Sequence, residues 1–173
     1  LLNALDSRIA NEPNKLAEWA YYIEADKVGE PLGKQDQYAV SFGGFNLIEF
    51  KGGYFNRVDD IKITPLKVPE DFKDYLLFFY TGNGHKASEV LGDYKFPDYF
   101  RDISNLVKLF AVHLQQGDYE VCGQYVGASW VMKKKLSPKV SNPEIDVLYN
   151  KAISAGVWGG KLCGAGGGGF FMF

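Results

Sequence analysis

Residues 159–173 read GGKLCGAGGGGFFMF and carry the most specific pattern in the chain. Apolar residues on both sides of the glycines predict a strand, a glycine loop at 164–169 and a second strand. The loop contains the pattern GxGxxG, but Phe170 to Phe173 continue as a strand and do not open a helix, so a dinucleotide-binding turn is excluded. A tight hairpin, which needs only one or two glycines, remains an alternative. So many glycines favour a backbone that closely approaches another backbone or a ligand.

Three helices and one more strand are predicted before this stretch. Periodicity and cap signals place the helices at 100–117, 119–135 and 143–155. Asn142 directly precedes Pro143, which is typical of an N-cap followed by the first helical residue. The run Tyr75 to Tyr80 is apolar throughout and does not alternate with polar residues, so it predicts a buried strand.

The first part of the chain is expected to mix helices with a hairpin. Helices are predicted over 15–28 and 34–42, and strands over 46–50 and 61–66. Asn14 is the candidate N-cap of the first helix. Pro65 and Pro69 bracket a predicted boundary, after which we expect a second lobe.

Length and composition limit the class of protein. A chain of 173 residues predicts about one domain, or two small ones sharing a core. Apolar residues make up 46% and charged residues 23%, which is typical of soluble globular proteins. The net charge of -2 provides no field to gather nucleic acid or anionic lipid. No apolar run approaches the roughly 20 residues of a membrane helix. Cys122 and Cys163 form no CxxC pair, so we expect a cytoplasmic protein.

Charged residues in the two early helices are candidates for chemistry. Asp36 lies in a first helical turn, where the dipole favours a carboxylate whatever its function. Lys34 in the same turn opposes the dipole, which suggests an anionic ligand or a partner carboxylate. Glu24, taken alone, fits a solvated helix face. The run Lys133 to Lys135 at a helix C-terminus is explained by the dipole and by solvation.

Several short motifs follow one another in a specific order. They are Ile23-Glu24, Gly29-Glu30-Pro31, Gly33-Lys34-Gln35-Asp36-Gln37-Tyr38, Phe42-Gly43-Gly44-Phe45-Asn46, Phe79-Tyr80-Thr81-Gly82, Ser141-Asn142-Pro143-Glu144-Ile145-Asp146 and the stretch 159–170. In this order they resemble the GHMP family of small-molecule kinases, and within it the sugar kinases that act at an anomeric hydroxyl. The spelling is most similar to the subfamily of D-glycero-D-manno-heptose 7-phosphate kinases. The last stretch resembles the family's third glycine motif, which is highly specific.

The resemblance implies a fold, a reaction and a set of site residues. The fold would be a two-lobed α+β architecture, with residues 1–66 ending an N-terminal lobe like ribosomal protein S5 domain 2 and residues 67–173 forming most of a ferredoxin-like C-terminal lobe. The reaction would be ATP-dependent phosphorylation of a sugar phosphate, with Asp36 as catalytic residue and Glu24 as ligand of Mg²⁺. The residues expected to bind the substrate are Gly33, Lys34, Gln37, Gly43 and Gly44. Those expected near ATP and substrate are Gly164, Ala165, Gly166, Gly167, Gly168 and Gly169.

The chain also departs from the family pattern. The first family motif and the serine-rich ATP loop do not occur in it, and we expect them upstream of Leu1. The sequence begins without Met and stops inside the apolar run 170–173, so we expect a fragment of a longer protein that is inactive alone. His85-Lys86 stands where the resemblance predicts a serine-arginine pair.

Three functions remain open on the sequence. The first is a heptose 7-phosphate 1-kinase, the second a galactokinase or fucokinase, and the third a non-catalytic sugar sensor on the same fold. Lys34 favours the first, because a cation suits an anionic sugar phosphate and a neutral sugar has no use for it. Retention of Asp36 and Glu24 argues against the sensor. The expected partners are a sugar phosphate and ATP, with no nucleic acid and no membrane, and either a monomer or a homodimer is possible.

Overall fold

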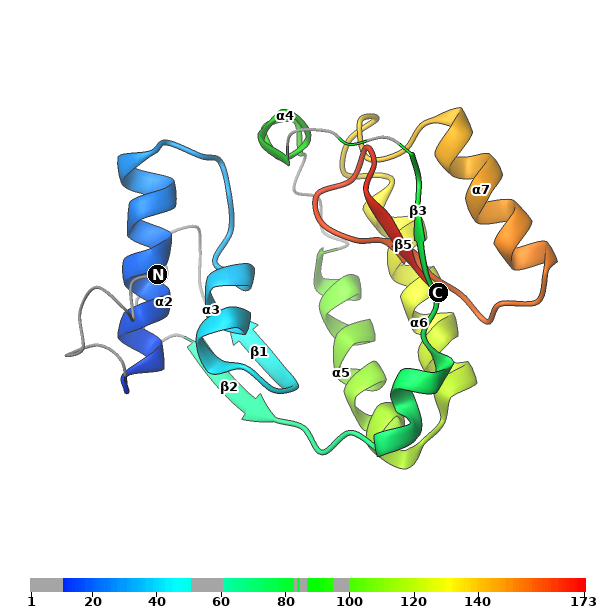
Figure 1. Cartoon of the computed structure of the whole chain (residues 1–173), viewed down its shortest axis with the longest axis horizontal. Helices are drawn as coiled ribbons and strands as arrows, with labels where there is room; N and C mark the ends of the chain where they lie inside the picture. The colour runs from blue at the N-terminus through cyan, green and yellow to red at the C-terminus, as the bar shows by residue number, and fades with distance from the viewer. Residues whose placement is uncertain (1–10, 51–60, 83, 85–86, 95–99) are drawn as a thin grey trace. The chain divides into compact units, whose positions relative to one another are not determined.

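The computed structural model describes residues 11–50, 61–82, 84, 87–94 and 100–173 (Figure 1). The chain divides into two units, Leu1–Lys67 and Val68–Phe173. The predicted lobes at 1–66 and 67–173 stay predictions, and each unit is considered by itself below. Helices and antiparallel strands occur in both units, which confirms the α+β class.

The first unit opens on helix α2 (Pro13–Tyr21), which continues as a π-helical segment, η1 (Tyr22–Lys27). The helical span predicted over 15–28 is therefore confirmed, but its interior differs. A π-helical turn carries i to i+5 hydrogen bonds, such as the 2.9 Å bond from the Val28 N–H to the Ile23 carbonyl. Apolar spacing does not distinguish this winding from an ordinary α-helix, because the apolar positions still fall on one broad face.

The start of α2 corrects the predicted cap. Glu12 is the N-cap, Pro13 begins the helix, and no side chain caps it. The prediction of Asn14 as N-cap is therefore wrong. Proline at a first helical position needs no N–H partner and presets the helical φ, so Pro13 begins the helix one residue before the polar residue that usually marks the boundary.

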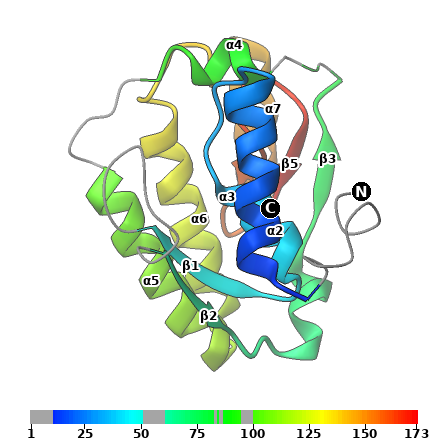
Figure 2. The ribbon, with the colours of Figure 1, turned by 90° about the vertical axis from the view of Figure 1, so that its left-hand side faces the viewer.

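Helix α3 (Gln35–Phe42) and strands β1 (Asn46–Phe50) and β2 (Ile61–Pro65) complete the first unit. The strands pair antiparallel from Asn46 with Pro65 to Phe50 with Ile61, which confirms the predicted hairpin. Its turn, including Lys51-Gly52-Gly53, lies outside the described residues. Helices α2 and α3 lie side by side in two views (Figures 1 and 2). Tyr38 is fully buried in this unit and stacks on Phe42, with ring centroids 6.1 Å apart.

The second unit contains a three-stranded antiparallel sheet and its helices. The sheet order is β3 (Phe78–Tyr80), β5 (Phe170–Met172), β4 (Lys161–Leu162). The helices are η3 (Glu70–Tyr75, 3-10), α4 (Ala87–Leu91), α5 (Phe100–Gln116), α6 (Tyr119–Lys133) and α7 (Pro143–Ser154). The three long helices confirm the predicted spans within two residues. The Asn142 side chain accepts a 2.9 Å hydrogen bond from the Ile145 N–H, which confirms the predicted cap.

A core of buried side chains joins the sheet to the helices of this unit. Its members are Val90, Trp130, Val140, Ile145, Leu162 and Phe171. Trp130 from α6 meets Phe171 from β5 edge to face, with ring centroids 5.9 Å apart. Because Leu162 and Phe171 are register partners, β4 and β5 both anchor the ends of the glycine loop in this core.

The prediction of a buried strand over 75–80 is wrong in two respects. Tyr75 ends the 3-10 helix, and the strand begins only at Phe78. Phe78, Phe79 and Tyr80 are 58%, 55% and 59% exposed. The strand lies at the sheet's edge and pairs only with β5 among the described strands, so its apolar run is not covered on both faces. An apolar run alone does not reveal whether a neighbour exists to cover it.

None of the helices in the described part of the chain is both long and apolar enough to cross a membrane.

Candidate active site

The glycine loop 164–169 connects β4 to β5, which pair antiparallel. In this sense the two strands form a hairpin, but the connection is not a tight turn. Gly164, Gly166, Gly167 and Gly169 all have positive φ, between 69° and 126°. A Cβ added at Gly166 would lie 2.8 Å from the Val140 Cα, which is closer than real Cβ contacts come. The expected close approach to another backbone is therefore present, and the partner is the segment before α7.

Hydrogen bonds hold this loop along its length. The Gly167 N–H donates to the Val140 carbonyl at 2.9 Å, and the Gly169 N–H donates to the Thr81 hydroxyl at 3.1 Å. The Thr81 N–H donates back to the Gly169 carbonyl at 2.8 Å. The Tyr94 hydroxyl donates to the Ala165 carbonyl, and burial raises the pKa of Tyr94. The loop is thus fastened to the segment before α7, to the residue after β3 and to the segment after α4.

In the first unit, Glu24 and Gln37 lie together. The Gln37 side-chain amide donates a hydrogen bond to Glu24 Oε2. Glu24 comes from the π-helical segment η1 and Gln37 from α3, so two predicted site residues thirteen positions apart meet here. The solvated-face interpretation of Glu24 is correct for its exposure, but the carboxylate is also held by a partner.

Gln37 is only 8% exposed, and its Oε1 has no hydrogen-bond partner among the described residues. A buried polar atom without a partner costs free energy, so its retention needs a reason. The Nε2 atom of the same side-chain amide donates to Glu24 Oε2 and so orients the Glu24 carboxylate, which explains why Gln37 is buried here. This geometry makes Gln37 a residue that positions Glu24.

Lys34 is the N-cap residue of α3, and its side chain is 11% exposed. Its ammonium donates to both carboxylate oxygens of Glu18 on α2, at 2.8 and 3.0 Å. Glu18 also accepts a 2.6 Å hydrogen bond from the Tyr38 hydroxyl. Burial first, and Glu18 second, raise the pKa of Tyr38. Of the two explanations for a lysine at this position, the structure shows the partner carboxylate.

Asp36 is exposed in the first turn of α3. Its neighbour Gln37 is buried, so the two adjacent residues face solvent and interior respectively. Gly33 precedes the helix, and a Cβ added there would meet nothing within 4 Å. Gly43 and Gly44 follow the helix with φ of 61° and 65°, which only glycine adopts without strain, and they turn the chain into β1. Asp36 is therefore exposed at the start of a helix that has glycines on both sides, Gly33 before it and Gly43 and Gly44 after it.

Glu24 is the predicted ligand of Mg²⁺, and its surroundings decide whether it suits that ion. No group of three or more His, Cys, Asp or Glu side chains that could hold a metal occurs among the described residues. Mg²⁺ usually keeps several waters and binds one or two carboxylates together with substrate phosphates. Glu24, exposed and held at one oxygen, fits the place of one such carboxylate.

Four residues that shape these sites, Glu18, Thr81, Tyr94 and Val140, have roles that the sequence did not predict. Glu18 lies in none of the motifs, and the sequence indicated only that Lys34 could have a partner carboxylate, without identifying it. Tyr94 and Val140 hold the glycine loop from positions up to 71 residues away in sequence, where local patterns carry no signal. Thr81 lies in the motif Phe79 to Gly82, but the motif did not indicate its hydrogen bonds to Gly169, 88 residues away.

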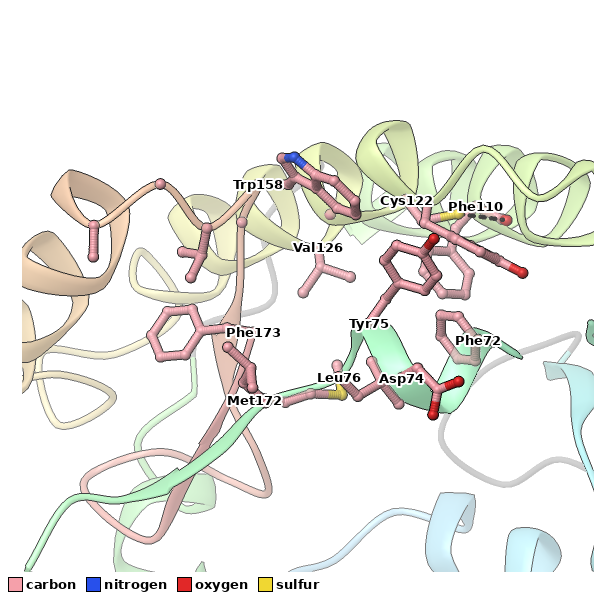
Figure 3. A pocket seen from close by; sticks show the side chains of 17 residues that line it. Phe72, Asp74, Tyr75, Leu76, Phe110, Cys122, Val126, Trp158, Met172 and Phe173 are labelled. Carbon is pink, nitrogen blue, oxygen red and sulfur yellow. Dashed lines mark hydrogen bonds between the residues drawn. The ribbon is translucent and has the colours of Figure 1, made fainter. Parts of the chain in front are cut away.

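A pocket of about 370 Å³ lies elsewhere in the second unit (Figure 3). Tyr75, Val126, Trp158 and Phe173 are among its lining side chains, and Tyr75 stacks on Trp158 with ring centroids 5.7 Å apart. The lining is largely apolar and contains none of the predicted site residues. Asp74 contributes a carboxylate to this otherwise largely apolar lining.

The glycine loop, its strands and the preceding helices match a known family. Residues 108–173 match the family model described as GHMP kinases C terminal. Residues 108–173 are thus similar to the C-terminal domain of GHMP kinases. The resemblance inferred from the motifs is thereby confirmed for this part of the chain. The matched residues contain α6, α7 and the whole glycine loop, and they include Val140 and Lys133, which hold that loop.

Individual relatives are similar to this chain over more than the residues 108–173 that match the family model. The chain is 33% identical over 170 residues to the D-glycero-alpha-D-manno-heptose 7-phosphate kinase of Campylobacter jejuni subsp. jejuni serotype O:2, covering 92% of this chain and 49% of the relative. A solved Campylobacter jejuni protein described as a sugar kinase is 30% identical, with a TM-score of 0.60, over 93% of this chain and 47% of that one. The chain thus spans about half the length of these relatives.

Solved mevalonate kinases share the fold of most of this chain. The enzyme from Methanococcus jannaschii is 20% identical, with a TM-score of 0.60, over 94% of this chain and 48% of that one. The enzyme from L. major is 22% identical, with a TM-score of 0.59, over 80% of this chain and 42% of that one. At this identity the likeness concerns the fold alone, and it confirms the predicted GHMP kinase fold.

Proposed function

We propose that the protein to which this chain belongs transfers the γ-phosphoryl group of ATP to the anomeric hydroxyl of a sugar phosphate, with D-glycero-D-manno-heptose 7-phosphate as the substrate. The observation that carries the proposal is the 33% identity to a heptose 7-phosphate kinase across 92% of the chain. A span of that length includes the helix with Asp36, and the glycine loop lies in the residues that match GHMP kinases C terminal. Because the chain spans about half of that relative, the activity is proposed for the intact protein.

Asp36 is proposed to handle the proton. In the reaction the anomeric oxygen forms a bond to the γ-phosphorus, the bond from that phosphorus to the bridging oxygen breaks, and ADP leaves. The hydroxyl proton passes to the Asp36 carboxylate. Asp36 is suited to this role because it is exposed at the start of α3, where a substrate can reach it. The structure also places its neighbour Gln37 against Glu24.

Glu24 is proposed to hold Mg²⁺ together with the phosphates of ATP. A bound Mg²⁺ would neutralise charge on the phosphates. Gln37 keeps the Glu24 carboxylate in one orientation by donating to Oε2. Gln37 then acts on the metal ligand, and contact with the sugar phosphate is proposed for Asp36, Lys34 and the glycines that flank α3.

Replacing Glu24 with glutamine is expected to raise the Mg²⁺ concentration for half-maximal rate several-fold. A neutral amide oxygen is a weaker ligand for a hard dication than a carboxylate. The measurement is the initial rate of the intact protein against Mg²⁺ at saturating ATP. Asp26→Asn is the matched control, because Asp26 is an exposed carboxylate on the same π-helical segment. An unchanged titration in Glu24→Gln would return Glu24 to a solvated helix face.

Lys34 is proposed to favour the anionic sugar phosphate. Glu18 holds its ammonium at 2.8 Å, so a substrate phosphate would have to share this cation with a carboxylate. Replacing Lys34 with alanine is expected to reduce the preference for heptose 7-phosphate over unphosphorylated heptose by about 10-fold, since a charge-assisted contact contributes about 1.5 kcal/mol at the low end. Glu18→Gln is the control, because it keeps Lys34 and removes its competitor. A preference that is equal in wild type and Lys34→Ala would restrict Lys34 to the ion pair with Glu18.

A substrate screen tests the proposal as a whole. The intact protein is assayed for ATP turnover with heptose 7-phosphate, galactose, fucose and mannose phosphates. We expect the highest kcat/KM with heptose 7-phosphate. Galactose or fucose as the best substrate would contradict the heptose assignment and leave a sugar kinase. No turnover with any sugar would favour the non-catalytic sensor.

A further inference from the structure

Lys133, the last residue of α6, reaches the start of the glycine loop. Its ammonium donates to the Gly164 carbonyl, and it lies 3.5 Å from the Leu162 carbonyl. In the described part of the chain no carboxylate forms an ion pair with Lys133. Its neighbour Lys134, by contrast, pairs with Asp146 at 2.9 Å. The two adjacent lysines therefore have different roles, although the sequence presents them as one basic run.

The surroundings of Lys133 are unfavourable for a positive charge. Burial first, and the charge of Lys161 second, lower the pKa of Lys133 to about 8. Cys163 acts in the opposite direction. Lys161 and Cys163, both from the β4 region, are the titratable groups that face the ammonium. No carboxylate in the described part of the chain offsets this cost, so the favourable contacts of the Lys133 ammonium are those with the Leu162 and Gly164 carbonyls.

The remaining anchors of the loop are neutral groups. Tyr94 donates to the Ala165 carbonyl, Val140 accepts from Gly167, and Thr81 exchanges two hydrogen bonds with Gly169. Among the described residues Lys133 is thus the charged anchor of the loop. A hydrogen bond from a charged donor is roughly twice as strong as a neutral one, so Lys133 has the largest influence on where the loop begins.

We infer that Lys133 is a positioning residue, and that its ammonium fixes the Gly164 carbonyl so that the glycine loop 164–169 takes its working shape. This inference rests on the proposed function for its catalytic consequence, but not for the structural contact. The ammonium is the form that anchors the loop, so the anchor weakens as pH rises through the pKa of Lys133. Turnover is then expected to fall on the alkaline side of pH 8.

Stability is expected to change in the opposite direction. The folded-state pKa of Lys133 lies below the ordinary value of 10.5. Between the two values the unfolded chain binds more protons, so the contribution of this group to folding stability rises as pH rises. Removing the ammonium should therefore not destabilise the fold, although it should impair the loop. A purely structural lysine would show both losses together.

The test compares Lys133→Met, Lys133→Arg and Lys134→Met in the intact protein. Amide hydrogen exchange of the peptide covering 163–170 is measured at pH 7 and pH 9.5. Lys133→Met is expected to exchange about 10-fold faster than wild type at pH 7, with the difference lost at pH 9.5. Lys134→Met should match wild type. Equal exchange in Lys133→Met and wild type at pH 7 would overturn the inference.

The second readout is kcat against pH from 6.5 to 10. Wild type should lose turnover with an apparent pKa near 8, whereas Lys133→Arg should not, because arginine stays charged. Lys133→Met should have at least about 10-fold lower kcat with KM and unfolding free energy little changed. A kcat that follows unfolding free energy would overturn the positioning role. Altered loop exchange without any sugar turnover in wild type would contradict the proposed function and leave the anchor in place.

Discussion

Replacing Asp36 with asparagine is expected to lower kcat of the intact protein by at least about 100-fold, with little change in sugar affinity. A positioned acid or base typically contributes 10²–10⁴-fold, and it acts mainly in the transition state. Asparagine keeps the shape of the side chain but cannot take the proton. Asp36 is exposed, so the variant should fold normally. The measurement is steady-state kcat and KM, with sugar affinity from equilibrium binding.

The control for Asp36 is a second exposed carboxylate in the same unit. Asp26→Asn removes one charge from the π-helical segment and should leave kcat close to wild type. The comparison separates a local role of Asp36 from a general effect of net charge. Equal turnover in Asp36→Asn and wild type would remove Asp36 from the mechanism.

Replacing Gly166 with valine is expected to abolish turnover, by at least about 100-fold, because the loop cannot keep its path. An added Cβ would lie 2.8 Å from the Val140 Cα and 2.9 Å from its carbonyl oxygen, both of which are backbone atoms. The φ of 126° at Gly166 adds strain for any other residue. Together these terms should cost about 2–4 kcal/mol of unfolding free energy. The measurements are kcat and denaturant unfolding.

Gly164→Ala is the matched control for this variant. Gly164 also has positive φ, at 69°, but nothing lies within 4 Å of its added Cβ. It should therefore show only the cost of a left-handed residue, about 1–2 kcal/mol. If Gly166→Val were no less stable than Gly164→Ala, the close approach to Val140 would not govern the loop.

Helix and strand positions were predictable wherever the pattern is local. The cap at Asn142 and the hairpin of β1 with β2 rest on neighbouring residues, and both are confirmed. The π-helical winding of η1 and the exposure of Phe78 to Tyr80 depend on tertiary surroundings, and both were missed. Burial is decided by what covers a strand, and the strand's own residues do not carry that information.

The candidate site shows the same division. The glycine run indicated a close backbone approach, and Gly166 makes one. Its partner Val140 could not be predicted, because the contact is with backbone atoms, which every residue has, and no side-chain type indicates it. The ion pair of Lys34 was foreseen as one of two possibilities, but nothing in the sequence singled out Glu18. The different environments of Lys133 and Lys134 depend on which helix face meets β4.

The most direct test of the account is the identity of the product. The intact protein is incubated with ATP, Mg²⁺ and D-glycero-D-manno-heptose 7-phosphate, and the products are followed by ³¹P NMR. The account predicts ADP and a heptose bisphosphate whose new phosphorus signal couples to the anomeric proton. A new phosphate on any other hydroxyl, or ADP release without a sugar product, would contradict it.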